Sequence, residues 1–169
     1  MIKIFSKIAR SLCMVLLVAG TGFSTVSADS KDIEAVNQVL NAYHKAAGEG
    51  DWDTYFNQMA ETSVFLGTDI TERWTKKEFQ AYAETRPTGW KYTPKKRNID
   101  MTPDENAAFF DEILLSEQYG YSRGSGVLIR TKSGWKISQY NLTFPIPNDV
   151  FTEITKQFQG LVADQVKDN

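Results

Sequence analysis

Apolar residues recur at helical spacing in the first part of the chain and at alternate positions later. An apolar stripe over residues 33–47 predicts a helix that starts near Ser30 and ends at Gly48. Asp51 is placed to cap a short second helix. Thr75 and Glu78 have the spacing of a capping box and predict a third helix, which ends near Pro87.

From about residue 90 the period changes to two. Strands are predicted at 90–101, 107–117, 121–131 and 135–144, with an earlier short strand at 63–66. Pro145 and Pro147 break the sheet, and a C-terminal helix with one apolar face follows. Helices followed by antiparallel strands predict an α+β domain. We expect a cone-shaped, curved, mainly antiparallel sheet, with the N-terminal helices on its concave face and a C-terminal helix added. Such a cone leaves a pocket between sheet and helices.

The first 28 residues have the composition of a cleavable signal peptide. Three basic residues precede an uncharged, mainly apolar run over 12–20, and the segment ends in the small residues Val26, Ser27 and Ala28. A spanning helix needs about 20 apolar residues, so a retained membrane anchor is the less favoured alternative. We expect cleavage after Ala28, a periplasmic or secreted protein, and a single domain over residues 29–169.

The charge and the cysteine content of the chain restrict the classes of partner that it could bind. Residues 29–169 hold all 21 acidic residues but only 16 of the 19 basic ones, a net charge of −5. An acidic surface disfavours nucleic acid and, after signal cleavage, anionic membranes. The single cysteine, Cys13, leaves with the signal peptide, so no thiol or disulfide is expected in the mature chain.

Two segments are similar to a known family. The run Arg123-Gly124-Ser125-Gly126-Val127-Leu128 and the hairpin Gly134-Trp135-Lys136-Ile137, followed by an alternating polar strand, resemble the SnoaL-like group of the nuclear transport factor 2-like superfamily. The segment around Phe65 to Trp74 is also similar. The resemblance covers about Ile33 to Asn148 and implies the cone fold, a small-molecule pocket, and often a homodimer through the sheet. It does not imply one reaction, because this fold hosts enzymes and non-enzymatic modules alike.

The alternation of side chains along the strands predicts which polar residues face the pocket. On the last strand, Lys136 needs water, so we expect Gln139 and Asn141 to face inward. On the 107–117 strand either face could be inward, and we favour the face that carries Glu112, where the resemblance also places a carboxylate. A carboxylate in an apolar cone has a raised pKa and is a candidate general base or acid. The alternative is a structural carboxylate on the wet face or paired with an arginine.

His44 is the single histidine, which excludes a two-histidine dehydratase mechanism. It lies on the apolar stripe of the first helix and is a candidate proton carrier, although a structural histidine is the commoner case. Without cysteine or a second histidine, no metal and no cofactor is expected. Asp69 lies at a possible pocket mouth, or else caps the entry to a helix as a solvated charge. The basic run Lys95 to Arg97 is expected to be a solvated strand edge. The aromatic residues expected to line the pocket, if they are not simply core, include Tyr55, Trp74 and Tyr121.

Three functions remain open at this point. The first is binding of a small apolar or amphipathic molecule, oriented by Asn141, Gln139 and Glu112. The second is a proton-transfer or hydrolytic enzyme, of the ketosteroid-isomerase-like type, using Glu112 or His44. The third is an interaction domain that dimerises through the opposite sheet face, which this alternation assigns to Ile113, Leu115, Leu128, Tyr140 and Leu142.

Overall fold

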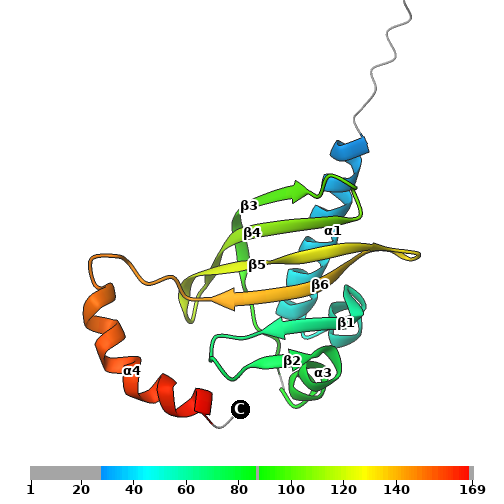
Figure 1. Ribbon diagram of the computed structural model, residues 1–169. Coiled ribbons are helices and arrows are strands. Elements are labelled where there is room, and N and C mark those ends of the chain that lie inside the picture. Colours follow the sequence, from blue (N-terminus) through cyan, green and yellow to red (C-terminus); the bar gives the residue numbers. More distant parts are fainter. Residues whose placement is uncertain (1–27, 87, 168–169) are drawn as a thin grey trace, which may run out of the picture.

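One curved sheet of six strands forms the centre of the computed structural model, which describes residues 28–86 and 88–167 (Figure 1). The strands are β1 (Met59–Leu66), β2 (Arg73–Thr75), β3 (Thr93–Met101), β4 (Ala107–Ser116), β5 (Gly120–Thr131) and β6 (Gly134–Thr143). Their order across the sheet is β2-β1-β6-β5-β4-β3. All neighbours are antiparallel except β1 and β6, which run parallel. The predicted mixed fold with a mainly antiparallel, curved sheet is confirmed, and the sheet stays open between β2 and β3.

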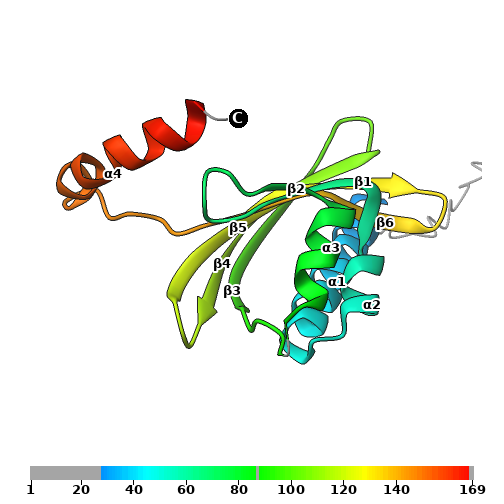
Figure 2. The same ribbon diagram turned by 90° about the horizontal axis from the view of Figure 1, so that it is seen from below.

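Three helices cover one face of this sheet: α1 (Ala28–Glu49), α2 (Trp52–Asn57) and α3 (Lys76–Glu84) (Figure 2). The helical stripe predicted for α1 is buried from Val36 onward, and Leu40 is fully enclosed. Phe79 of α3 meets it in the same core, together with Leu128 and Ile137 from the sheet. The helices therefore bury the concave face, as burial of apolar side chains requires.

The predicted capping box at the start of α3 is present. The Thr75 hydroxyl accepts from the Glu78 backbone N–H, and the Glu78 carboxylate accepts from the Thr75 backbone N–H at 2.8 Å. Thr75 is also the last residue of β2, a strand of three residues that is too short to show an alternating pattern. The cap thus fixes the point at which the chain leaves the sheet and enters the helix.

The alternation along β6 changes at Ser138. Ile137 is buried, the register against β5 then shifts, and the next buried side chain is Tyr140. Gln139 is exposed and Asn141 is half-buried on the face away from the helices. The prediction that Gln139 and Asn141 face inward is therefore wrong. A β-bulge adds one residue to the strand, so every later side chain moves to the opposite face.

The C-terminal helix α4 (Phe151–Lys167) lies apart from the other three helices (Figures 1 and 2). It follows the linker that contains Pro145 and Pro147, and its apolar residues Phe158 and Leu161 are exposed. The expected signal peptide lies outside the described residues except for Ala28, where α1 begins. None of the helices in the described part of the chain is long and apolar enough to cross a membrane.

Candidate functional site: a buried carboxylate network and an aromatic cleft

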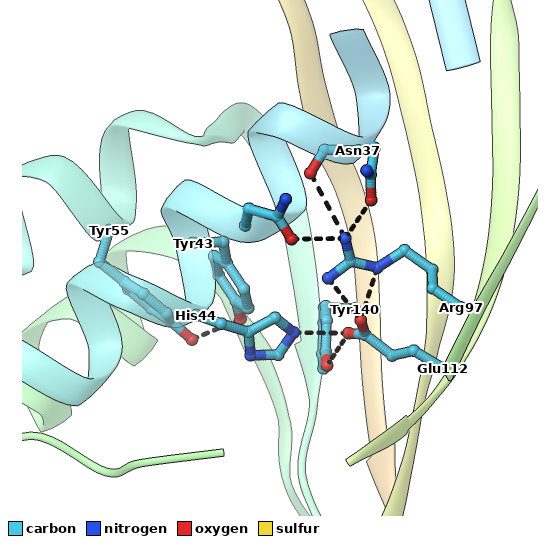
Figure 3. Close-up of polar contacts among 8 residues, drawn as sticks. Asn37, Tyr43, His44, Tyr55, Arg97, Glu112 and Tyr140 are labelled. Atoms are coloured by element: carbon cyan, nitrogen blue, oxygen red, sulfur yellow. Dashed lines mark hydrogen bonds and ion pairs between the residues drawn. The ribbon is translucent and has the colours of Figure 1, made fainter. Parts of the chain in front are cut away.

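Glu112 is the centre of a buried polar network (Figure 3). The alternation of β4 points Glu112 inward with Phe110 and Leu114, as favoured above, and no part of its side chain is exposed. Its Oε1 lies 2.6 Å from His44 Nε2 and accepts from the Tyr140 hydroxyl at 2.8 Å. Its Oε2 accepts from Arg97 Nε at 2.8 Å and lies 2.7 Å from Arg97 Nη2. Both carboxylate oxygens therefore have two partners each.

Arg97 connects this carboxylate to the first helix. It stands opposite Glu112 in the pairing of β3 with β4, and its side chain is only 8% exposed. Its Nη1 donates to the side-chain oxygens of Asn37 and Asn41 on α1, the second at 2.8 Å. The network thus joins α1, β3, β4 and β6 through charge-assisted hydrogen bonds, which are the strong ones.

The Glu112 pKa is lowered, contrary to the raised value expected from an apolar cone. Burial alone raises the pKa of this carboxyl, but the hydrogen bond and attraction of His44, the charge of Arg97 and the Tyr140 hydroxyl outweigh it. Glu112 therefore remains an anion with every acceptor position occupied. It orients its neighbours and is not available as a general base or acid.

Tyrosine rings pack beside the network. Tyr140 lies 5.0 Å from Tyr43 between ring centroids, and Tyr43 stacks on Tyr55 and shares a hydroxyl hydrogen bond with it. Burial, followed by the charge of Glu112, raises the Tyr140 pKa well above its usual value, so this hydroxyl stays a donor. Gly124 of β5 makes room for it, because a Cβ at this position would collide with the Tyr140 hydroxyl and with Glu112 Oε1.

A cavity of about 430 Å³ opens beside His44, between the C-terminal part of α1 and the start of β3. The imidazole donates toward Glu112 with Nε2, and its other nitrogen points away from the carboxylate (Figure 3). The cavity wall also contains Asn41, Lys45, Lys91 and Tyr92. His44 therefore bridges the buried network and an accessible space.

A larger cleft of about 650 Å³ lies at the open end of the cone. The turn between β1 and β2, the C-terminal end of α3 and the turn between β4 and β5 surround it. Aromatic rings form a large part of its walls: Phe65 stacks on Phe79 with centroids 3.8 Å apart, and Trp74 meets Tyr82 edge-on at 4.6 Å. Arg86, whose guanidinium lies 4.5 Å from the Tyr82 ring centroid, and Lys91 contribute positive charge. We call this space the aromatic cleft.

The residues that the sequence suggested for the pocket lie in different parts of the structure. Trp74 lines the aromatic cleft, but Tyr55 is 1% exposed inside the core and Tyr121 is 66% exposed on the outer sheet face. Asp69 is a solvated charge in an exposed turn, where its carboxylate accepts from the Thr71 N–H at 2.9 Å, and it caps the turn rather than a helix. Among the described residues no cluster of three histidine, cysteine or acidic side chains could hold a metal ion.

Sequence reasoning missed Arg97 and Tyr140. Arg97 was expected on a solvated edge with Lys95 and Lys96, and Tyr140 on the outer face. A bulge precedes each: the register of β3 shifts between Pro94 and Lys96, and that of β6 shifts at Ser138. The available signal was the antiparallel pairing of β3 with β4, which brings a basic residue opposite the inward carboxylate of β4.

Comparisons with known proteins agree on the fold. A nuclear transport factor 2-like protein of unknown function from Pseudomonas putida KT2440 superposes with a TM-score of 0.59 at 12% identity, covering 72% of this chain and 91% of that one. A protein from Streptomyces avermitilis, named as a possible dehydratase of the nuclear transport factor 2-like family, gives 0.59 at 15% identity, covering 70% and 99%. One from Novosphingobium aromaticivorans, named as a possible scytalone dehydratase, gives 0.60 at 12% identity, covering 69% and 86%.

The comparison with curated proteins finds no match. The three structural neighbours named above are below 25% identity and therefore establish the fold alone. The family comparison is more specific, because the SnoaL-like domain family matches residues 36–147, which include the buried network, the His44 cavity and most of the wall of the aromatic cleft. This chain belongs to the SnoaL-like domain family, within the nuclear transport factor 2-like fold.

Proposed function

We propose that this SnoaL-like domain binds a small amphipathic molecule in the aromatic cleft. The observation that carries the proposal is a space of about 650 Å³ whose walls combine aromatic rings with Arg86 and Lys91. Small-molecule sites are concave, mostly apolar and fixed by a few polar groups, and their volumes are roughly 300–1,000 Å³. The rings favour a flat, partly aromatic ligand. Arg86 and Lys91 attract an acidic group, and Glu72 and Glu117, which also line the cleft, attract a donor group, so the ligand carries polar groups as well as an apolar body.

Anilinonaphthalene sulfonate, a flat aromatic anion, is a suitable first probe. Tyr82 is 36% exposed in the cleft, and Tyr121 is 66% exposed on the outer sheet face, so the two tyrosines form a matched pair. Replacing Tyr82 by Ala should weaken the fluorescence titration about 3- to 10-fold, because an aromatic contact contributes roughly 0.5–1.5 kcal/mol. Tyr121→Ala should leave the affinity unchanged. Equal affinities in the wild type and both variants would refute the cleft as the binding site.

Export is the second part of the proposal. The basic start, apolar run and small-residue end of segment 1–28 support removal of this segment and activity outside the cytoplasm. The test is to determine the N-terminus of the protein recovered from the periplasmic or secreted fraction of its bacterial host. A chain that begins at Asp29 supports export, whereas an intact Met1 chain confined to the cytosol contradicts it.

A second copy of the chain is the partner that the outer sheet face favours. Phe109 and Ile113 on β4 are 50% and 40% exposed there, on the face that α1, α2 and α3 leave uncovered (Figure 2). Leu128 and Tyr140, expected on this face from the sequence, are buried on the other side. Ile113→Glu should convert a dimer to a monomer in light-scattering mass measurements, with Glu117→Gln as the control. A wild-type monomer at high concentration would exclude this interface.

A further inference from the structure

The C-terminal helix α4 carries an apolar stripe that stays open to solvent. With 3.6 residues per turn, the apolar side chains fall on one side of the helix, and all of them except Ile154 are exposed: Phe151, Ile154, Phe158, Leu161 and Val162. A helix of 17 residues gains most of its stability in a protein from packing such a stripe against another surface. The stripe of α4 therefore requires a surface that covers it.

The position of α4 shows which surface is within reach. It lies beyond the ends of the strands, and the sheet separates it from α1, α2 and α3 (Figures 1 and 2). The linker 145–150 joins it to β6, and Pro145 and Pro147 keep this linker out of the sheet, because proline lacks an N–H and restricts φ. Near its other end, the side chain of Gln165 forms a hydrogen bond with Asp69 in the turn between β1 and β2. Both ends thus hold α4 away from the outer face of its own sheet.

The outer sheet face offers the apolar surface that matches this stripe. Phe109 and Ile113 on β4 and Tyr121 on β5 are exposed there, on the side of the sheet where α4 lies (Figure 2). A second copy placed against this face brings its own outer face within reach of the first copy's α4. By two-fold symmetry, the second α4 then reaches the first copy. Exchange of an identical element between two copies is a known route to closed dimers.

The area of α4 fits such a dimer. A helix of 17 residues is about 26 Å long and about 10 Å wide, so each α4 covers roughly 250 Å² of the other copy. Two such helices, counted together with the surfaces that they cover, remove on the order of 1,000 Å² from water, which is about the least that a specific interface buries. Contact between the remaining parts of the two outer faces adds to this area.

We propose that α4 is a dimerisation arm, whose apolar stripe packs on the outer sheet face of a second copy while the arm of that copy packs on the first. Phe158 and Leu161 are the central contacts of the arm, and they meet Phe109 and Ile113 of the second copy. The inference rests on the proposal that a second copy covers the outer sheet face, and it names the segment that this copy supplies. It is independent of binding in the aromatic cleft, whose described wall contains no residue of α4.

Light-scattering mass measurements on the full chain, over a range of concentrations, test the arm. Leu161→Glu should raise the dimer dissociation constant about 100-fold, because two buried leucine side chains are lost in each dimer. Ala163→Glu adds the same charge on the other side of α4 and should dimerise like the wild type. A wild-type dimer that Leu161→Glu leaves unchanged would overturn the arm alone. A wild-type monomer would overturn both the arm and the outer-face interface.

Cross-linking identifies the chain that the arm contacts. Cys13 is the single cysteine, so Cys13→Ser gives a background without thiols. In this background, one protein carries Phe158→Cys and a second protein, with a tag of different mass, carries Phe109→Cys. After the two exchange subunits, a short bismaleimide should join them, whereas Ala163→Cys in place of Phe158→Cys should give little product. Failure of the mixed proteins to join would overturn the exchange, and so would a link that forms only within a chain carrying both cysteines.

Discussion

Removal of the Arg97 guanidinium tests the network most directly. Arg97→Met keeps much of the apolar stem but leaves Glu112 Oε2 without both of its partners, while the carboxylate stays 0% exposed. Breaking a buried pair from one side costs roughly 3–5 kcal/mol, because an uncompensated charge remains inside. Against a total stability of about 5–15 kcal/mol for a domain of this kind, that loss is readily measured by urea unfolding.

A second substitution separates the charge from the loss of packing. Glu112→Gln keeps an acceptor for His44 and Tyr140 but removes the negative charge. The double variant Arg97→Met, Glu112→Gln should therefore be less destabilised than the sum of the two single variants, by about 2 kcal/mol of coupling free energy. Additive effects, with coupling below about 0.5 kcal/mol, would refute the view that Arg97 acts mainly through the Glu112 charge.

The pH dependence gives an independent check. In the wild type the Glu112 pKa lies below its ordinary value of 4.5, so its contribution to stability is present above that pH and is lost as the pH falls through the lowered pKa. Without Arg97, one of the causes that lower the Glu112 pKa is lost, so this pKa rises relative to the wild type and acid relieves the penalty by protonating the carboxyl. The difference in the free energy of unfolding between the wild type and Arg97→Met should thus become smaller as the pH falls from about 7 to about 4. A difference in the free energy of unfolding that stays the same over this pH range would contradict this account.

Two other substitutions test local packing. Gly124→Ala should lower the free energy of unfolding in urea by about 1–3 kcal/mol and change the near-ultraviolet tyrosine signal, because the added methyl group displaces the Tyr140 hydroxyl from Glu112. Gly160→Ala in α4 is the control. A Cβ there meets nothing within 4 Å, so this substitution should be neutral or stabilising. Thr75→Ala should lower the free energy of unfolding by about 1 kcal/mol by removing the α3 cap, and an unchanged value would show that the capping box contributes nothing measurable.

Elements with a strong period were predictable from the sequence. The α1 stripe, the capping box and the division of β4 into two faces follow from spacing alone, because a regular helix or strand returns a side chain to the same face at fixed intervals. Spacing left open which face of β4 is inward, and the resemblance to the SnoaL-like group favoured the face that carries Glu112. The three-residue β2 was not predictable, since it contains no full period. A pocket was expected from the fold, but the positions of the two cavities and most of their lining were beyond reach, because each is formed by segments distant in sequence.

The wrong placements of Arg97 and Tyr140 share one cause, which also determines the chemistry of the site. A shift of register in β3 turns Arg97, from a run of three basic residues, toward Glu112 Oε2, and the bulge at Ser138 turns Tyr140 toward Oε1. A regular alternation cannot reveal a one-residue insertion. Because these two donors, with His44, occupy both oxygens, the carboxylate becomes a fixed anion and ceases to be a base. His44 then links this fixed anion, through the 2.6 Å contact, to the cavity that it also lines.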